Sequence, residues 1–157
     1  KAGAALRKSI GDTIYAEKFD REYDMEGVPL GYRYEESPII VSDSTPEIPF
    51  EVMTYTPTAR PGHRAPHAWL SDGRSTLDLF GQGFTFLAFD QDINLECLVE
   101  AARSRSVPLK IETLETKKIA ALYDKKFVLV RPDGHVAWRS NDLPEDFSQI
   151  IDVTRGA

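Results

Sequence analysis

The sequence predicts an α/β domain built around a mixed β-sheet. Residues 84–89 form a nearly continuous apolar run, which is typical of a strand buried on both faces. A helical pattern at 93–105 and a strand at 107–114 follow, so we expect a parallel pair with a right-handed crossover. Strands at 127–130 and 136–139 are separated by a Pro-Asp-Gly turn and should pair antiparallel.

The flanking segments complete this fold. Residues 115–124 predict a short helix or turn, and 143–153 predict a closing amphipathic helix. Apolar stretches at 67–70 and 75–79 flank an Asp-Gly sequence, which indicates a β-hairpin in front of the sheet. This order of elements is the thioredoxin-like arrangement with an additional N-terminal hairpin.

The first third of the chain has a different character. Residues 4–22 carry apolar side chains near i, i+4 spacing, which predicts an amphipathic helix whose apolar stripe must pack against something. Residues 24–36 are rich in turn-forming residues, and 43–62 contain four prolines, so this part is a proline-rich connector. We therefore divide the chain into a helix and connector at 1–62, left from the end of an upstream domain, and a sheet domain at 63–157.

Composition argues against several classes of function. The 157 residues carry a formal net charge of -6 and a pI near 5.1, which disfavours binding to nucleic acid or to an anionic membrane. No run approaches the roughly 18 apolar residues of a membrane span. A single cysteine excludes an internal disulfide and fits a reducing cytoplasm. Because the first residue is Lys rather than Met, we expect a piece of a longer protein.

Cys97 is the sole thiol, so dithiol exchange by a Cys-x-x-Cys motif is excluded. A peroxiredoxin-like single-cysteine peroxidase is an alternative, since Ala65-Pro66, the Asp-Gly turn and a buried strand before a cysteine resemble the opening of those enzymes. Peroxiredoxins place Thr or Ser three residues before the cysteine, where this chain has Asn94. Glu96 and Glu100 would raise the pKa of the thiol, so a buried structural cysteine is the favoured interpretation.

The sequence contains no complete motif for binding a metal ion or a dinucleotide. The three histidines do not cluster with acids or thiols, no metal site is predicted, and His135 is expected to be exposed. Asp90–Asn94 lacks the glycine and glutamate of a calcium loop, so Asp92 or Asn94 is better interpreted as a helix N-cap. Gly81-Gln82-Gly83 precedes a strand instead of following one, which excludes a dinucleotide fingerprint. The residues alone thus favour an interaction or structural module.

Several separated segments carry a resemblance to a known family. They read Gly-Tyr-Arg-Tyr at 31–34, Arg-Pro-Gly-His-Arg-Ala-Pro-His at 60–67, Gly-Arg-Ser-Thr-Leu-Asp-Leu-Phe-Gly at 73–81, Gly-Phe-Thr-Phe-Leu at 83–87 and Val-Arg-Pro-Asp-Gly-His-Val-Ala-Trp-Arg at 130–139. This combination resembles the C-terminal region of FAD-dependent aromatic hydroxylases, the phenol-hydroxylase and p-hydroxybenzoate-hydroxylase-like flavoprotein monooxygenases. The resemblance covers about residues 26–140.

The resemblance implies a division of labour. A whole enzyme of this family uses FAD and NADPH or NADH to insert one oxygen atom of O₂ into a phenolic ring. The family's flavin-binding motifs lie upstream, so no catalytic or cofactor-binding residue is expected in this chain. The corresponding C-terminal region is thioredoxin-like without redox cysteines, and in several members it contributes to dimer contacts. The implied role is structural, with the upstream flavin domain and a second copy of the chain as partners.

Five residues inside the matched motifs are candidates for such contacts: Arg64, His67, Asp78, Trp138 and Arg139. An equally valid interpretation is that these side chains form local hydrogen-bonded corners. A free-standing interaction module is the alternative to a domain of a larger hydroxylase.

Overall fold

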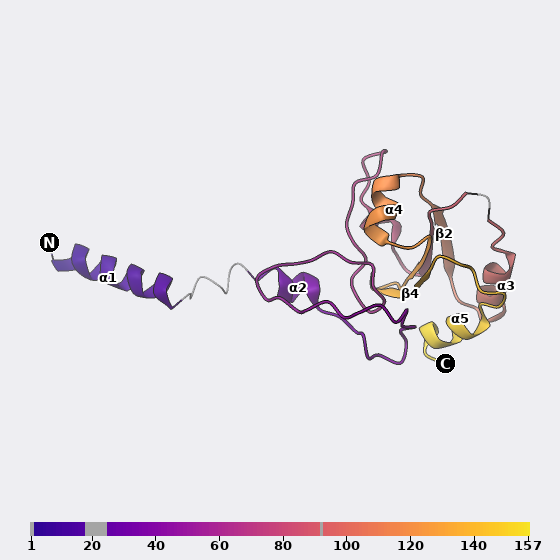
Figure 1. Cartoon of the computed structure of the whole chain (residues 1–157), viewed down its shortest axis with the longest axis horizontal. Coiled ribbons are helices and arrows are strands. Elements are labelled where there is room, and N and C mark those ends of the chain that lie inside the picture. Colours follow the sequence, from indigo (N-terminus) through magenta and orange to yellow (C-terminus); the bar gives the residue numbers. More distant parts are fainter. Residues whose placement is uncertain (1, 18–24, 92) are drawn as a thin grey trace. The chain divides into compact units, whose positions relative to one another are not determined.

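The computed structural model describes residues 2–17, 25–91 and 93–157 (Figure 1). Its elements are α1 (Ala2–Ala16), α2 (Gly27–Gly31), the 3-10 helix η2 (Thr76–Leu79), β1 (Phe84–Ala88), α3 (Glu96–Ser104), β2 (Leu109–Thr113), α4 (Lys117–Tyr123), β3 (Phe127–Val130), β4 (Val136–Ser140) and α5 (Ser148–Arg155). They belong to two compact units. The first combines residues up to Gly31 with Pro49–Thr56, and the second combines 32–48 with 57–157.

A four-stranded sheet of order β2-β1-β3-β4 organises the second unit in the described part of the chain. β1 pairs in parallel with β2 and antiparallel with β3, and β3 pairs antiparallel with β4. The turn into β4 closes where the amide of Gly134 donates to the carbonyl of Arg131 at 2.9 Å, with Gly134 at a φ of 79°. The predicted mixed α/β sheet is therefore confirmed.

Two hydrophobic clusters lie on opposite faces of this sheet. Successive β1 side chains alternate, so Phe86 points to one face and Leu87 to the other, and all of β1 is buried. Leu98 of α3 and Ile151 of α5 cover the Phe86 face, whereas Tyr123 of α4 covers the Leu87 face. Figure 1 shows α3 and α5 together on one side of the sheet and α4 on the other. The prediction that the apolar run at 84–89 forms a strand buried on both faces is confirmed by β1.

Two helices begin later than the sequence pattern predicts. α3 begins at Glu96, because the side chain of Asn94 accepts a hydrogen bond from the Glu96 amide at 2.8 Å. α5 begins at Ser148, whose amide donates to the carboxylate of Asp146 at 2.8 Å. Such local side-chain bonds compete with helical backbone bonds and delay the first turn. The N-cap position of α3 is Leu95, so the prediction of Asn94 as the N-cap was wrong, and the other candidate, Asp92, lies outside the described residues.

The hairpin expected at 67–79 is only partly present. Its turn forms around Gly73, which has a φ of 85°, and Trp69 bridges Ser75. The second predicted strand is wrong, because η2 occupies Thr76–Leu79. Ser75 and Asp78 cap the first turn of this 3-10 helix with a reciprocal capping box, which overrides the apolar alternation.

α1 confirms a helix in the first segment, while residues 18–22 of the predicted span lie outside the described residues. It buries no side chain, and the exposed fractions of Leu6 and Tyr15 are 62% and 75%. Its apolar side chains are thus without a covering surface within the described residues. Within those same residues, no helix has the length and apolarity needed to cross a membrane.

Candidate functional site

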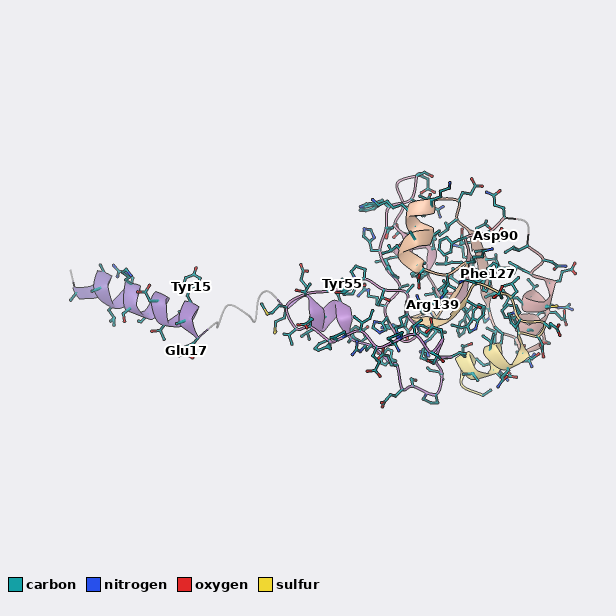
Figure 2. The ribbon with its side chains drawn as sticks, in the orientation of Figure 1. Tyr15, Glu17, Tyr55, Asp90, Phe127 and Arg139 are labelled. Carbon is teal, nitrogen blue, oxygen red and sulfur yellow. The ribbon has the colours of Figure 1, made fainter. Side chains whose placement is uncertain are left out.

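A buried network of charged side chains fixes the 32–48 segment to the sheet. Arg139 on β4 lies in the interior of the second unit with only 6% of its surface exposed (Figure 2). Its Nε donates to Oδ2 of Asp43 at 2.6 Å and its Nη2 donates to Oγ1 of Thr45 at 3.3 Å. Nη1 donates to the backbone carbonyl of Tyr123 at 3.4 Å. One guanidinium group thereby joins the 32–48 segment, β4 and the end of α4.

Arg60 extends the network away from β4. Its Nε and Nη2 donate to the carbonyl oxygen of Thr45 at 3.1 and 2.8 Å, and its Nη1 pairs with Glu35. Oε1 of Glu35 lies 2.9 Å from Nε2 of His63, and Oε2 lies 3.4 Å from Nε of Arg33. Glu35 is therefore the carboxylate on which three nitrogen-bearing side chains converge.

The network holds His63 in its neutral form. Burial lowers the pKa of His63 to about 4, and nearby positive charges act in the same direction, chiefly those of Arg33, Arg60 and Arg139. A neutral ring that faces Glu35 donates its Nε2–H to the carboxylate. The contact between His63 and Glu35 is thus a hydrogen bond and not an ion pair at neutral pH.

Asp43 stays ionised because its hydrogen bonds and the nearby positive charge outweigh the effect of burial. Burial alone would raise the pKa of its carboxyl group, but hydrogen bonds from Thr45 and Arg139 and the charge of Arg139 together hold that pKa below its usual value. The side chain of Asp43 is 10% exposed and that of Arg139 is 5% exposed, so the pair is shielded from solvent. It is an ion pair of the buried class, in which each charge depends on the other.

We expect acid to weaken the fold through His63. Because the pKa of folded His63 is about 4 and that of the unfolded chain is near 6.5, the unfolded state binds more protons between these values and stability falls as pH falls. The loss from pH 7 to pH 4.5 should be about 2 kcal/mol. Urea unfolding at both pH values would measure it. His63→Gln should reduce this loss, and His67→Gln, at an exposed position, should keep it. An unchanged pH dependence in His63→Gln would contradict the assignment.

The sequence-predicted interface residues occupy different parts of the second unit. His67 and Asp78 meet at Ser75: Nδ1 of His67 lies 2.7 Å from Ser75 Oγ, and Oδ2 of Asp78 accepts the Ser75 amide at 2.7 Å. Trp138 lies in the aromatic core and is 7% exposed. Arg64 lines a cavity described below. Only Arg139 joins the buried network, and a contact role for the five residues stays a prediction.

Sequence reasoning did not single out most of the network: Glu35, Asp43, Arg60 and His63. A weak signal exists in 32–35, where Arg and Glu alternate with two tyrosines. In an extended segment, such alternation places the two charged side chains on the same side. In the structure Arg33 and Glu35 are half-buried, whereas Tyr32 and Tyr34 are more exposed.

The interpretation of Cys97 as a buried structural residue was wrong, because Cys97 is exposed. The buried stripe of α3 runs through Leu98, Ala101 and Ala102, and Cys97 lies beside that stripe. Its neighbours Glu96 and Glu100 are exposed as well. Within 2–17, 25–91 and 93–157, no group of three or more His, Cys, Asp or Glu residues is placed to hold a metal ion.

A family model decides the class of this chain. The model described as aromatic-ring hydroxylase, C-terminal, matches residues 58–155. The chain belongs to this family. The matched segment contains the whole sheet and the network residues Arg60, His63 and Arg139, and it agrees with the resemblance drawn from the sequence motifs.

Relatives of this aromatic-ring hydroxylase domain are monooxygenases. The chain is 34% identical over 99% of its length to the FAD-dependent monooxygenase apdD of Emericella nidulans, of which it covers 26%. It is 31% identical over 90% of its length to 2,4-dichlorophenol 6-monooxygenase of Cupriavidus pinatubonensis, again covering 26%. The chain thus spans about a quarter of these relatives.

Solved structures of related flavin enzymes share the fold. Native and K252c-bound RebC-10x superposes with a TM-score of 0.85 at 40% identity, covering 99% of this chain and 29% of that one. Aklavinone-11 hydroxylase in complex with FAD and aklavinone superposes with a TM-score of 0.63 at 29% identity, covering 83% of this chain and 26% of that one.

Proposed function

We propose that this chain is the C-terminal domain of an FAD-dependent monooxygenase that hydroxylates phenolic or other aromatic compounds, and that its role there is structural. The FAD-dependent relative apdD and the dichlorophenol monooxygenase support the reaction class. In the whole enzyme, FAD reduced by NADPH or NADH would supply the chemistry that inserts one atom of O₂. In this proposal the 157 residues hold neither cofactor and are inactive alone.

The observation that carries the structural role is the buried network. Residues 32–48 precede the segment matched by the family model, yet they form one compact unit with it. Asp43 and Glu35 bring their carboxylates into that unit, where Arg139 and Arg60 bind them. Because a shielded ion pair with good geometry resists separation, the polypeptide entering the sheet domain is held in one conformation. A rigid entry suits a domain that supports a neighbouring flavin domain.

The strand order supports the thioredoxin-like description of the second unit. β3 runs antiparallel to its neighbours in the order β2-β1-β3-β4, and β1 and β2 are joined through α3. The sequence has no second cysteine, so we assign this unit no dithiol exchange. The proposed partners are the upstream flavin domain of the same protein and a second copy of the chain, in the cytoplasm.

A direct test uses the purified chain. Mixed with FAD and passed through gel filtration, it should elute without flavin absorbance. With NADPH, FAD and a phenol, it should consume NADPH no faster than free FAD does. Sedimentation equilibrium of the same sample should report a dimer. Retention of FAD together with phenol-dependent NADPH consumption would overturn the structural assignment, and a monomer at all concentrations would overturn the dimerisation role.

A further inference from the structure

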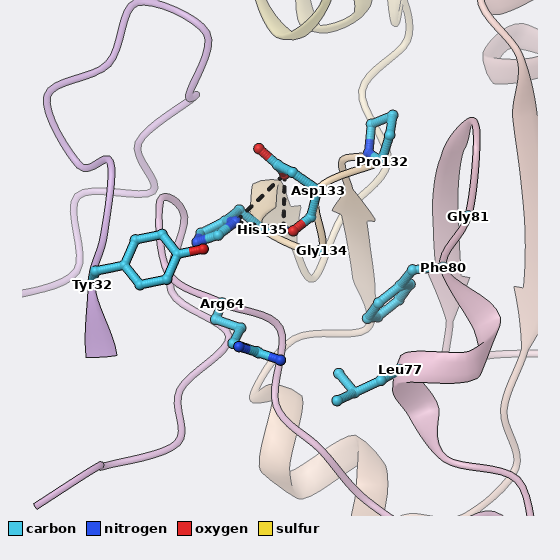
Figure 3. A pocket seen from close by; sticks show the side chains of 9 residues that line it. All are labelled: Tyr32, Arg64, Leu77, Phe80, Gly81, Pro132, Asp133, Gly134 and His135. Atoms are coloured by element: carbon cyan, nitrogen blue, oxygen red, sulfur yellow. Dashed lines mark hydrogen bonds and ion pairs between the residues drawn. The ribbon is translucent and has the colours of Figure 1, made fainter. Parts of the chain in front are cut away.

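A cavity of about 290 Å³ opens beside the turn that joins β3 and β4 (Figure 3). Its size approaches the lower end of the range for small-molecule sites. The side chains that matter for its chemistry are Tyr32, Arg64, Leu77, Phe80, Asp133 and His135. All of them belong to the second unit. The buried network described above does not use any of these side chains as a partner.

His135 lines this cavity and carries an unsatisfied acceptor. The expectation that it is exposed was wrong: 1% of its surface is exposed, because the rings of Tyr32 and Tyr34 pack on it at centroid distances of 5.0 and 4.8 Å. Nδ1 lies 3.3 Å from the carbonyl oxygen of Asp133, which can only accept, so Nδ1 carries the proton. Burial lowers the pKa of His135 and keeps the ring neutral. Nε2 then offers a lone pair, and it has no hydrogen-bond partner among the described residues.

Arg64 lies next to His135 and brings an unpaired cation. The two residues face each other in an antiparallel bridge, with hydrogen bonds on both sides of the pair but none between them. In such pairs the Cα atoms are about 4.5 Å apart and the side chains project to the same side. The guanidinium group of Arg64 has no ion pair or hydrogen bond within the described ranges. Asp133, the carboxylate in the cavity wall, is paired with Arg131 at 2.9 Å.

The remaining wall is apolar. Figure 3 shows Leu77 and Phe80 across the cavity from Tyr32 and His135, with the Arg64 side chain between them. Phe80 also lies near the turn, since a Cβ placed on Gly134 would be 4.0 Å from its ring. A molecule in this space would meet a ring surface at one end, a cation in the middle and a hydrogen-bond acceptor at the other end.

We propose that this cavity binds a small organic acid that carries a hydroxyl group beside its carboxylate and an apolar ring. The carboxylate pairs with Arg64, the hydroxyl donates its hydrogen to Nε2 of His135, and the ring packs against Leu77 and Phe80. The hydroxyl is required because Nε2 can only accept, and the negative charge is required because Arg64 has no ion-pair partner among the described residues and the Asp133 carboxylate in the cavity wall is paired with Arg131. This site is separate from the proposed structural role and does not depend on it.

Mandelate is the probe that has all three features. We would titrate the 157-residue chain with mandelate, with phenylacetate, which lacks the hydroxyl, and with benzyl alcohol, which lacks the carboxylate. Calorimetry would give the affinities, and the ring ¹⁵N resonances of His135 would report contact at Nε2. Mandelate should bind at least about tenfold more tightly than either analogue, because each analogue leaves one buried or charged group unpaired. Only mandelate and benzyl alcohol, which both carry the hydroxyl, should shift the ¹⁵N resonance of His135 Nε2.

Arg64→Met provides the matched variant. It should weaken mandelate binding at least about tenfold and leave benzyl alcohol binding unchanged. Arg103→Met is the control, since Arg103 lies on α3, exposed and paired with Glu100. The ligand series on the unaltered chain remains decisive if Arg64→Met does not fold. Equal affinities for the three ligands, no saturable shift at His135 with millimolar mandelate, or full binding by folded Arg64→Met would each overturn the proposal.

Discussion

Asp43→Ala is expected to lower the free energy of unfolding of the second unit by about 3–5 kcal/mol. The substitution removes the shielded carboxylate at 2.6 Å from the Arg139 guanidinium, and leaves only the solvent-exposed carboxylate of Asp124 at 3.5 Å. The loss is large because neither water nor the exposed Asp124 carboxylate replaces the short, shielded bond in full. Guanidinium chloride unfolding, followed by fluorescence of the buried Trp138, would measure the change.

Two comparison variants separate burial from simple loss of an ion pair. Glu100→Ala breaks an exposed pair with Arg103 and should change stability by less than about 1 kcal/mol. The double variant Asp43→Val with Arg139→Leu removes both charges and should recover most of the stability lost in Asp43→Ala. If Asp43→Ala were no more harmful than Glu100→Ala, the network could not be what fixes the 32–48 segment.

Phe86→Ala should be comparably severe, with a loss of about 3–5 kcal/mol. Phe86 is fully buried on the central strand β1. Its ring lies parallel to those of Phe127 and Trp138, at centroid distances of 6.1 and 6.3 Å, and meets Phe147 edge-on at 6.1 Å. Truncation removes the side chain that these three rings share, and rings anchored on two strands and beside a helix cannot all move inward to fill the space.

Two comparison variants, measured in the same denaturation assay, provide reference values for Phe86→Ala. Phe86→Leu keeps most of the apolar volume and should cost less than about 2 kcal/mol. Val99→Ala alters a side chain that is 45% exposed on α3 and should stay within about 0.5 kcal/mol. A small effect of Phe86→Ala, similar to that of Val99→Ala, would mean that the aromatic cluster does not hold the sheet to α5.

The sheet could be predicted because its signals are local. The apolar run at 127–130 stops at a Pro-Asp-Gly turn, and β3 occupies this range. The first residues of the helices were harder to predict. The apolar pattern extends the helices over Asn94 and Asp146, but these side chains bind nearby backbone amides and the helices begin after them. The 75–79 strand failed for a related reason, since the capping box around Ser75 folds that segment into η2.

The candidate site was harder to predict from the sequence than the sheet was. Arg139 was singled out by its motif, but its partner Asp43 lies 96 residues earlier in the chain. Neither apolar periodicity nor turn chemistry carries information on which distant charges will meet. His135 shows the same limit: its burial depends on two tyrosines about a hundred residues upstream. What sequence reasoning identified was the family, through motifs spread over the chain.

The buried network also constrains how this domain can be inherited. The carboxylates of Glu35 and Asp43 precede the segment 58–155, while Arg60 and Arg139 lie inside it. A gene fusion that transferred 58–155 alone would carry two interior guanidinium groups away from their shielded carboxylate partners, and would leave Arg139 only the exposed Asp124. The smallest piece that evolution can move intact therefore begins upstream of Glu35. Within lineages, substitutions at the acidic and basic positions should be fixed as pairs.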